Sequence, residues 1–140
     1  MIIVGDSVNK KLQIVKNEVI LMTEQQTILT LACVLKSSDQ AIMVNQLLSW
    51  QHEKARINDP EAFHEGNWWV YMPIREWQEQ LSWISEHTIR RNLKELKELG
   101  LIRIGNFNPN RYDRTRWYTV DEQALKKRIQ DNQNCVLKGR

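Results

Sequence analysis

The chain has 140 residues, a mass of 16.7 kDa and a net charge of +3, which suits one domain large enough to bury a core. Hydrophobic residues make up 41% and charged residues 26% of the chain, a composition that argues against disorder. No apolar run is long enough for a membrane span, and no basic region precedes an apolar stretch at the N-terminus. We therefore expect a cytoplasmic protein without a membrane partner.

The positive charge is concentrated in the second half of the chain. Residues 75–140 contain 14 basic and 9 acidic side chains, whereas residues 1–74 contain 6 and 8. Such asymmetry is a mild indication of a polyanionic partner. The alternative is a solvated surface whose charges happen to be unevenly distributed.

The first 37 residues predict an extension of short strands and one helix. Segments 11–15 and 18–22 are typical of two strands around Lys16 and Asn17, and the apolar spacing over 24–35 predicts a helix. Because apolar strands at one end of a chain can pair across a two-fold axis, we expect a homodimer. Cys33 and Cys135 match no zinc spacing and are expected to be free thiols.

The next segments predict a long helix, a loop and a strand. Ser37, Ser38 and Asp39 offer N-cap chemistry before a helix over 41–57, whose apolar stripe is Met43, Leu47, Trp50 and Ile57. Residues 58–67 are typical of a loop and residues 68–72 of a strand. Trp68 and Trp69 cannot both face inward on one strand, so one of them should be partly exposed.

Two further helices follow, joined by a short turn. Pro73 suits the first turn of a helix over 74–81, and Ser85 suits the N-cap of a helix over 86–99. Gly100 is placed to end the second helix. The spacing predicts that the second helix buries Ile89, Leu93, Leu96 and Leu99, and that Trp77, Trp83 and Trp117 belong to the core.

A strand over 101–104, a polar tip over 106–115 and a strand over 116–120 predict a β-hairpin. Asp121 should cap a last helix over 122–129, and the last ten residues should fray. A helix-turn-helix followed directly by a hairpin is the winged-helix arrangement. The predicted fold is therefore α+β and mostly helical: an extension over 1–37, a winged helix over 38–130 and a tail over 131–140.

The second helix of this pair carries basic side chains on its outer face. His87, Arg90, Arg91 and Lys94 fall at i, i+3, i+4 and i+7, on the part of the helix that enters a major groove in helix-turn-helix proteins. Thr88 suits a phosphate or a thymine methyl group, whereas Glu86 would repel phosphate. The alternative is a solvated face on which Arg and Lys provide solubility.

The hairpin tip carries a second basic group, in which Arg111, Arg114 and Arg116 face only one acid, Asp113. We expect Asp113 to be structural and at least one arginine to contact phosphate. The alternative is an ion pair of Arg114 or Arg116 with Asp113. The complete predicted DNA-binding set is Ser85, His87, Thr88, Arg90, Arg91, Lys94, Asn108, Asn110, Arg111, Arg114 and Arg116.

Residues 38–125 resemble the winged-helix domain of phage and plasmid replication proteins, including replisome organisers and relatives of the DnaD primosomal family. The resemblance rests on Ser85-x-x-Thr88-Ile89-Arg90-Arg91, on Leu99-Gly100-Leu101-Ile102 and on Asp113-Arg114-Thr115-x-Trp117-Tyr118, together with the motifs Trp69-Val70-Tyr71, Glu76-Trp77, Asn106-Phe107-Asn108 and Ala41-Ile42-x-x-Asn45-Gln46-Leu47-Leu48-x-Trp50. It implies DNA binding, often at an origin and often as an oligomer, with replication proteins as further partners. Such proteins usually continue into a second domain, which this sequence does not include.

The sequence offers no support for an enzyme. Its glycines are isolated, no pair of histidines has a metal-binding spacing, and no cofactor motif is present. We therefore expect a sequence-specific double-stranded DNA-binding protein in plasmid or phage replication or maintenance. The alternatives are a transcriptional regulator with the same fold and a protein-interaction module that has lost DNA binding.

Overall fold

The computed structural model describes residues 10–15 and 18–138, with the side chains of residues 27–132. The fold is α+β and mostly helical, with small antiparallel sheets. It divides into an N-terminal unit, Met1–Asn45 with Glu122–Arg140, and a central unit, Gln46–Asp121. The 1–37 extension predicted from the sequence thus shares its unit with residues 38–45 and the last helix. Among the described residues, no helix has the length and apolar character needed to cross a bilayer.

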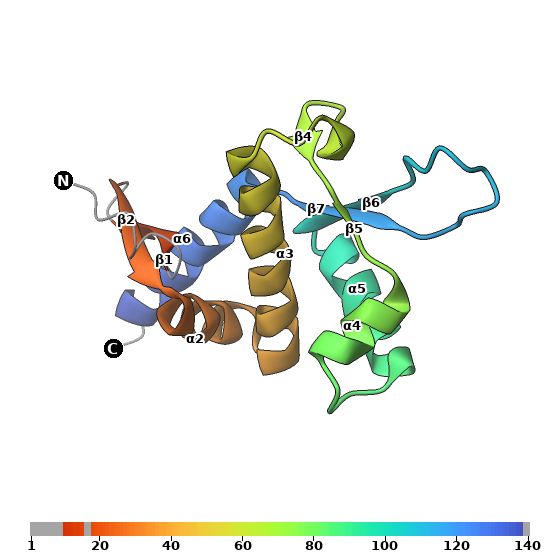
Figure 1. Ribbon diagram of the computed structural model, residues 1–140. Coiled ribbons are helices and arrows are strands. Elements are labelled where there is room, and N and C mark those ends of the chain that lie inside the picture. The colour runs from red at the N-terminus through yellow and green to blue at the C-terminus, as the bar shows by residue number, and fades with distance from the viewer. Residues whose placement is uncertain (1–9, 16–17, 139–140) are drawn as a thin grey trace. The chain divides into compact units, whose positions relative to one another are not determined.

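The N-terminal unit combines a β-hairpin with helices (Figure 1). β1 (Lys10–Val15) pairs antiparallel with β2 (Glu18–Thr23), which confirms the two predicted strands. α2 (Glu24–Leu35) confirms the predicted helix and contacts α6 (Glu122–Lys138). The prediction that the last ten residues fray is wrong for residues 131–138, because no Gly or Pro interrupts this segment and the helix continues.

α3 (Ser38–Arg56) begins in the N-terminal unit and ends in the central unit. Ser37 caps it, because its Oγ accepts a hydrogen bond from the Gln40 backbone N–H at 3.2 Å. Met43 and Leu47 are buried as predicted. The prediction for Ile57 is wrong: its side chain is 51% exposed, because the helix ends at Arg56 and Asn58 takes a positive φ of 53°.

The segment between α3 and the next helix contains more structure than the predicted loop and strand. It forms η1 (Pro60–Ala62), β3 (Phe63–His64), β4 (Asn67–Trp68) and β5 (Val70–Tyr71). The single strand predicted over 68–72 is interrupted at Trp69, whose backbone N–H donates to the Ala62 carbonyl at 2.8 Å. Trp69 is buried and Trp68 is half-buried, which confirms the prediction that one of the two tryptophans is partly exposed.

α4 (Ile74–Gln80) and α5 (Glu86–Glu98) confirm the predicted pair of helices. Pro73 occupies the N-cap position, and Ser85 caps α5 by accepting from the Thr88 N–H at 3.1 Å. Two core predictions are wrong: Trp83 is 60% exposed in the turn, and Leu99 is 43% exposed because the helix ends before it. Ile89, Leu93 and Leu96 are buried as predicted.

A three-stranded antiparallel sheet completes the central unit. β7 (Trp117–Val120) lies between β5 and β6 (Ile102–Gly105), which confirms the predicted hairpin. Its long loop, residues 106–116, projects from the sheet (Figure 1). The Gln51 side chain joins α3 to this sheet by accepting from the Val120 N–H at 2.8 Å and donating to the Val120 carbonyl at 3.4 Å.

Trp77 meets Tyr118 edge-on at 5.9 Å, so α4 packs on the same strand. Both side chains are almost fully buried, and burial raises the pKa of the Tyr118 phenol. The sheet and the two helices therefore share one core, and this core fixes the position of the β6–β7 hairpin relative to α5.

Candidate nucleic-acid interface

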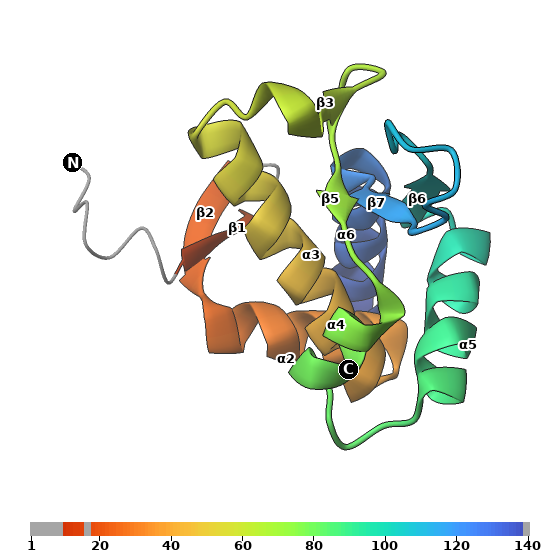
Figure 2. The same cartoon turned by 45° about the vertical axis from the view of Figure 1, so that its right-hand side comes forward.

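A cavity of about 790 Å³ lies between α5 and the β6–β7 hairpin. Figure 2 shows these two elements next to each other, as does Figure 1. Five of the residues that line the cavity are cationic and none is acidic. We call it the basic groove; it is lined by Arg90, Lys94, Lys97, Ile104, Gly105, Asn106, Arg114 and Arg116.

The helical side of the basic groove is made by Arg90, Lys94 and Lys97. They fall at i, i+4 and i+7, so they form one row along α5. Ile89, Leu93 and Leu96 are buried on another face and hold the helix against the core. Sequence reasoning identified Arg90 and Lys94 but missed Lys97, although the same helical spacing could have found it.

His87 and Arg91 are exposed on α5 but do not line the groove. Helical spacing puts both next to Lys94, on the side of the helix farthest from its buried stripe. Arg90 forms an ion pair with Glu86, with 3.0 Å between the Arg90 Nε and a carboxylate oxygen. Exposed i,i+4 pairs of this kind contribute only about 0.3–0.5 kcal/mol, so Glu86 does not fix Arg90 strongly.

Ser85 and Thr88 form the cap of α5. The Ser85 Oγ accepts from the Thr88 N–H and donates to the Thr88 Oγ1, both at 3.1 Å. The two predicted contact residues thus already satisfy each other at the helix start. Their principal effect is to fix where α5 begins, and therefore where its basic row lies.

The hairpin contributes Arg114 and Arg116 to the other side of the groove. Arg111 is exposed in the loop, where its guanidinium lies 5.1 Å from the centre of the Tyr112 ring. The Tyr112 side chain is itself 77% exposed. The basic side chains of the loop therefore divide into two that line the groove and one that lies outside it.

The two asparagines predicted as DNA contacts form hydrogen bonds that brace the loop. Asn108 donates through Nδ2 to the carbonyls of Asp113 and Thr115, each at 2.8 Å, and its Oδ1 accepts from the Trp117 Nε1 at 2.7 Å. The Asn110 Oδ1 accepts from the Tyr112 N–H at 2.9 Å. These bonds use both ends of the Asn108 amide, so we assign it to the loop and not to the interface.

Asp113 has the structural role that the sequence predicted. Its carboxylate accepts from the Thr115 N–H and from the Tyr71 hydroxyl, both at 3.0 Å. The bonds from Thr115, and then that from Tyr71, hold the pKa of the Asp113 carboxyl below its usual range. The alternative ion pair with Arg114 or Arg116 is not formed in the described part of the chain.

No group of His, Cys, Asp and Glu in the described part of the chain could hold a metal ion. Cys33 is an exposed free thiol, and the side chain of Cys135 lies outside the described residues. The basic groove, by contrast, brings five cationic side chains to one cavity.

Comparisons with known proteins add no relative to this description. No protein-family model, curated protein or solved structure matches the chain.

Proposed function

We propose that this protein is a winged-helix protein that binds double-stranded DNA through the basic groove. In this assignment α4, the turn and α5 form the helix-turn-helix, and the β6–β7 hairpin is the wing. α5 is then the recognition helix, since it is the second helix of the pair and carries the basic row.

The observation that carries the proposal is the convergence of five cations on one cavity without an acidic residue. Arg90, Lys94 and Lys97 come from the helix, whereas Arg114 and Arg116 come from the hairpin. A surface of this kind fits the phosphates of a duplex, because each neutralised phosphate releases condensed counterions. A merely solvated helix face does not explain why residues distant in sequence converge.

The exposed residues beside the groove would provide sequence specificity. Arg91 and His87 lie toward the N-terminal half of α5, the part that reaches base edges in helix-turn-helix proteins. A bidentate arginine–guanine contact contributes about 1–3 kcal/mol of discrimination. We therefore assign base reading to Arg91 and His87, and backbone contacts to the groove.

The biological role follows from the resemblance to phage and plasmid replication proteins. We propose a role in replication or maintenance of such an element, with a transcriptional regulator as the alternative. A replication protein and a transcriptional regulator would contact DNA through the same kinds of side chains. The position of the bound DNA site, at an origin or at a promoter, would distinguish the two roles.

We further propose that the protein acts as a homodimer whose N-terminal hairpin forms the contact. β1 and β2 pair only with each other in the described part of the chain, so each strand has a second edge without a strand partner. Such edges are templates for pairing with another chain.

The test of DNA binding is a fluorescence anisotropy titration of a duplex at several salt concentrations. We expect Lys94→Ala/Arg116→Ala, which removes one cation from each side of the groove, to weaken binding. The slope of log Kobs against log salt should become shallower by about 1.8, since each phosphate contact contributes about 0.9.

The matched control is Arg103→Ala/Lys127→Ala, which removes the same charge from exposed residues outside the groove. It should leave the salt slope close to that of the unmodified protein. Equal weakening by both double variants would show that net charge alone drives binding. Absence of binding at low salt would favour the protein-interaction module instead.

A further inference from the structure

A second cavity in the central unit has a different lining. It measures about 470 Å³ and shares no residue with the basic groove. We call it the aromatic pocket; it is lined by Lys54, Asp59, Glu61, Ala62, His64, Trp69, Tyr71, Phe107, Asn108, Pro109, Asp113 and Trp117. Its volume lies within the range of about 300–1,000 Å³ that is typical of small-molecule sites.

The rings of this pocket hold one another in place. Phe107 stacks on His64 at 4.2 Å and meets Trp69 edge-on at 4.8 Å and Trp117 edge-on at 5.8 Å. Tyr71 in turn meets Trp117 at 5.5 Å. A wall of mutually packed rings needs little rearrangement to accept a ligand, and the ring faces carry partial negative charge.

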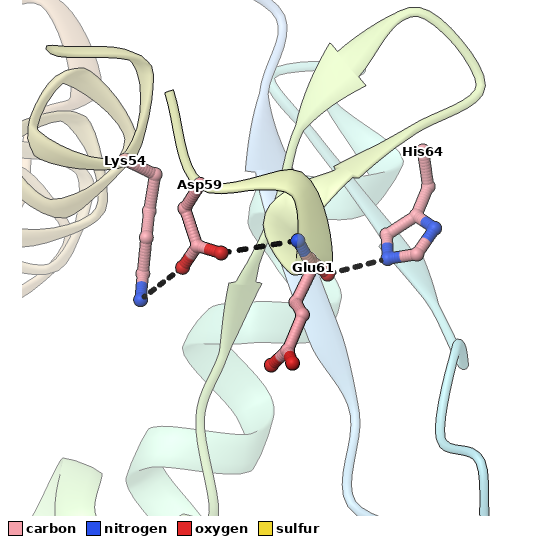
Figure 3. A network of polar contacts seen from close by, with 4 residues as sticks. All are labelled: Lys54, Asp59, Glu61 and His64. Carbon is pink, nitrogen blue, oxygen red and sulfur yellow. Dashed lines mark hydrogen bonds and ion pairs between the residues drawn. The ribbon is translucent and has the colours of Figure 1, made fainter. Parts of the chain in front are cut away.

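Three acidic residues, Asp59, Glu61 and Asp113, line the pocket together with these rings. Figure 3 shows Asp59 paired with Lys54, at 3.3 Å between the Lys54 Nζ and a carboxylate oxygen, and also accepting from the Glu61 N–H. The Glu61 backbone carbonyl accepts from the His64 Nε2 at 2.8 Å, which requires a proton on that nitrogen. The Glu61 carboxylate itself forms no ion pair within the described residues.

Asp113 adds a further negative charge from the hairpin side. Its bonds from Tyr71 and Thr115 keep the carboxylate ionised but do not neutralise it. The pocket therefore has three carboxylates and one lysine among its lining residues, and that lysine is paired with Asp59. The charge of the lining residues is therefore negative in the aromatic pocket and positive in the basic groove.

We propose that the aromatic pocket is a binding site for a small organic cation, one whose positive charge is carried on an apolar or aromatic body. The ring faces would attract the cation within about 6 Å of a ring centre, and Glu61 and Asp113 would supply the counter-charge. A nucleic acid is disfavoured, because its phosphates would meet the carboxylates. A single lysine or arginine side chain from a partner protein would leave much of the volume unfilled.

The test uses benzyltrimethylammonium as the probe and the indole N–H signals of the full chain in ¹⁵N-correlated NMR spectra. Trp69 and Trp117 line the pocket and donate their indole N–H groups to His64 and Asn108, so their signals report on it. We expect saturable shifts of both signals at about millimolar probe, while the signal of exposed Trp83 stays in place. Glu61→Gln should weaken binding by about two- to fivefold, because one counter-charge is lost while the shape is kept.

The matched control is Glu79→Gln, an exposed carboxylate of α4 that does not line the pocket. It should leave the affinity unchanged. Neopentylbenzene, in which carbon replaces the charged nitrogen, should bind more weakly than the cation. Equal binding of the two probes, or no saturable shift with the cation, overturns the proposal. Tighter binding of N-acetyl-L-argininamide would also overturn it and indicate a basic side chain of a partner protein. This inference is independent of the proposed function, since the experiment contains no DNA.

Discussion

At the scale of single residues, Gly105 lies between the two cavities. It is the last residue of β6 and lines the basic groove. A side chain at this position would point toward the Phe107 and Trp69 rings, which line the aromatic pocket. A Cβ atom at this position would lie 3.0 Å from the Phe107 ring and 3.2 Å from the Trp69 ring. Phe107 is held by several other rings, so it cannot easily move away.

We predict that Gly105→Ala lowers the free energy of unfolding by about 1–3 kcal/mol, the usual effect of overpacking. Urea unfolding followed by tryptophan fluorescence measures it. Phe107→Leu removes the crowded ring edge, so the double variant should lose less stability than the sum of the two single variants. Strictly additive losses would show that the contact between Gly105 and Phe107 is not the cause.

Sequence reasoning identified the residues of the basic groove better than their individual roles. Arg90, Lys94, Arg114 and Arg116 were predicted as contacts and do line it. Asn108 was predicted as a contact because it is polar and lies in the loop, yet its amide is bonded within the loop. A polar residue's type does not reveal which partner it meets, since that partner is set by the folded loop.

At the scale of elements, the end of α5 determines how the chain enters the hairpin. The Gly100 N–H donates to the Lys97 carbonyl at 2.9 Å, and the Leu101 N–H donates to the Leu96 carbonyl at 3.1 Å. These two bonds are those of the Schellman motif, and Gly100 has the positive φ, 77°, that the motif requires. The buried Leu101 follows at once, and β6 begins at the buried Ile102.

We predict that Gly100→Ala costs about 1–2 kcal/mol of stability, because a non-glycine residue is strained at this φ. No atom lies within 4 Å of the added Cβ, so crowding contributes nothing. Gly100→Asn should cost less, since asparagine tolerates the left-handed conformation. Thermal unfolding followed by circular dichroism compares the two variants, and equal losses would contradict a purely conformational origin.

The elements that sequence predicted best are those with local signals. The helix over 24–35 and the Ser85 cap follow from apolar spacing and cap chemistry, which act within a few residues. The segment 58–72 was predicted less well, because its three short strands and the break at Trp69 depend on partners outside the local sequence pattern, such as β7 for β5 and the Ala62 carbonyl for the Trp69 N–H. Exposed Trp83 was likewise missed, since helical spacing does not apply in a turn.

At the scale of the whole molecule, the proposed binding sites and the proposed dimer contact belong to different units. The basic groove and the aromatic pocket consist entirely of residues of the central unit. The N-terminal unit holds the β1–β2 hairpin, which neither cavity uses. A role for that hairpin in assembly can therefore be tested without altering the groove.

We predict that light scattering after size exclusion gives a mass near twice 16.7 kDa at micromolar concentration. Pairing of one strand edge with its symmetry mate would extend the two-stranded ribbon into a larger sheet, which is more stable than a hairpin alone. Gln13→Pro places a proline inside β1 and should disrupt the ribbon, so the mass should fall to that of one chain. A dimer that persists in Gln13→Pro would place the contact elsewhere, and a monomeric unmodified protein would contradict the prediction itself.

If the dimer forms, a duplex with two half-sites about 10 base pairs apart should bind two chains. Gln13→Pro should bind the same duplex more weakly while keeping its affinity for one half-site.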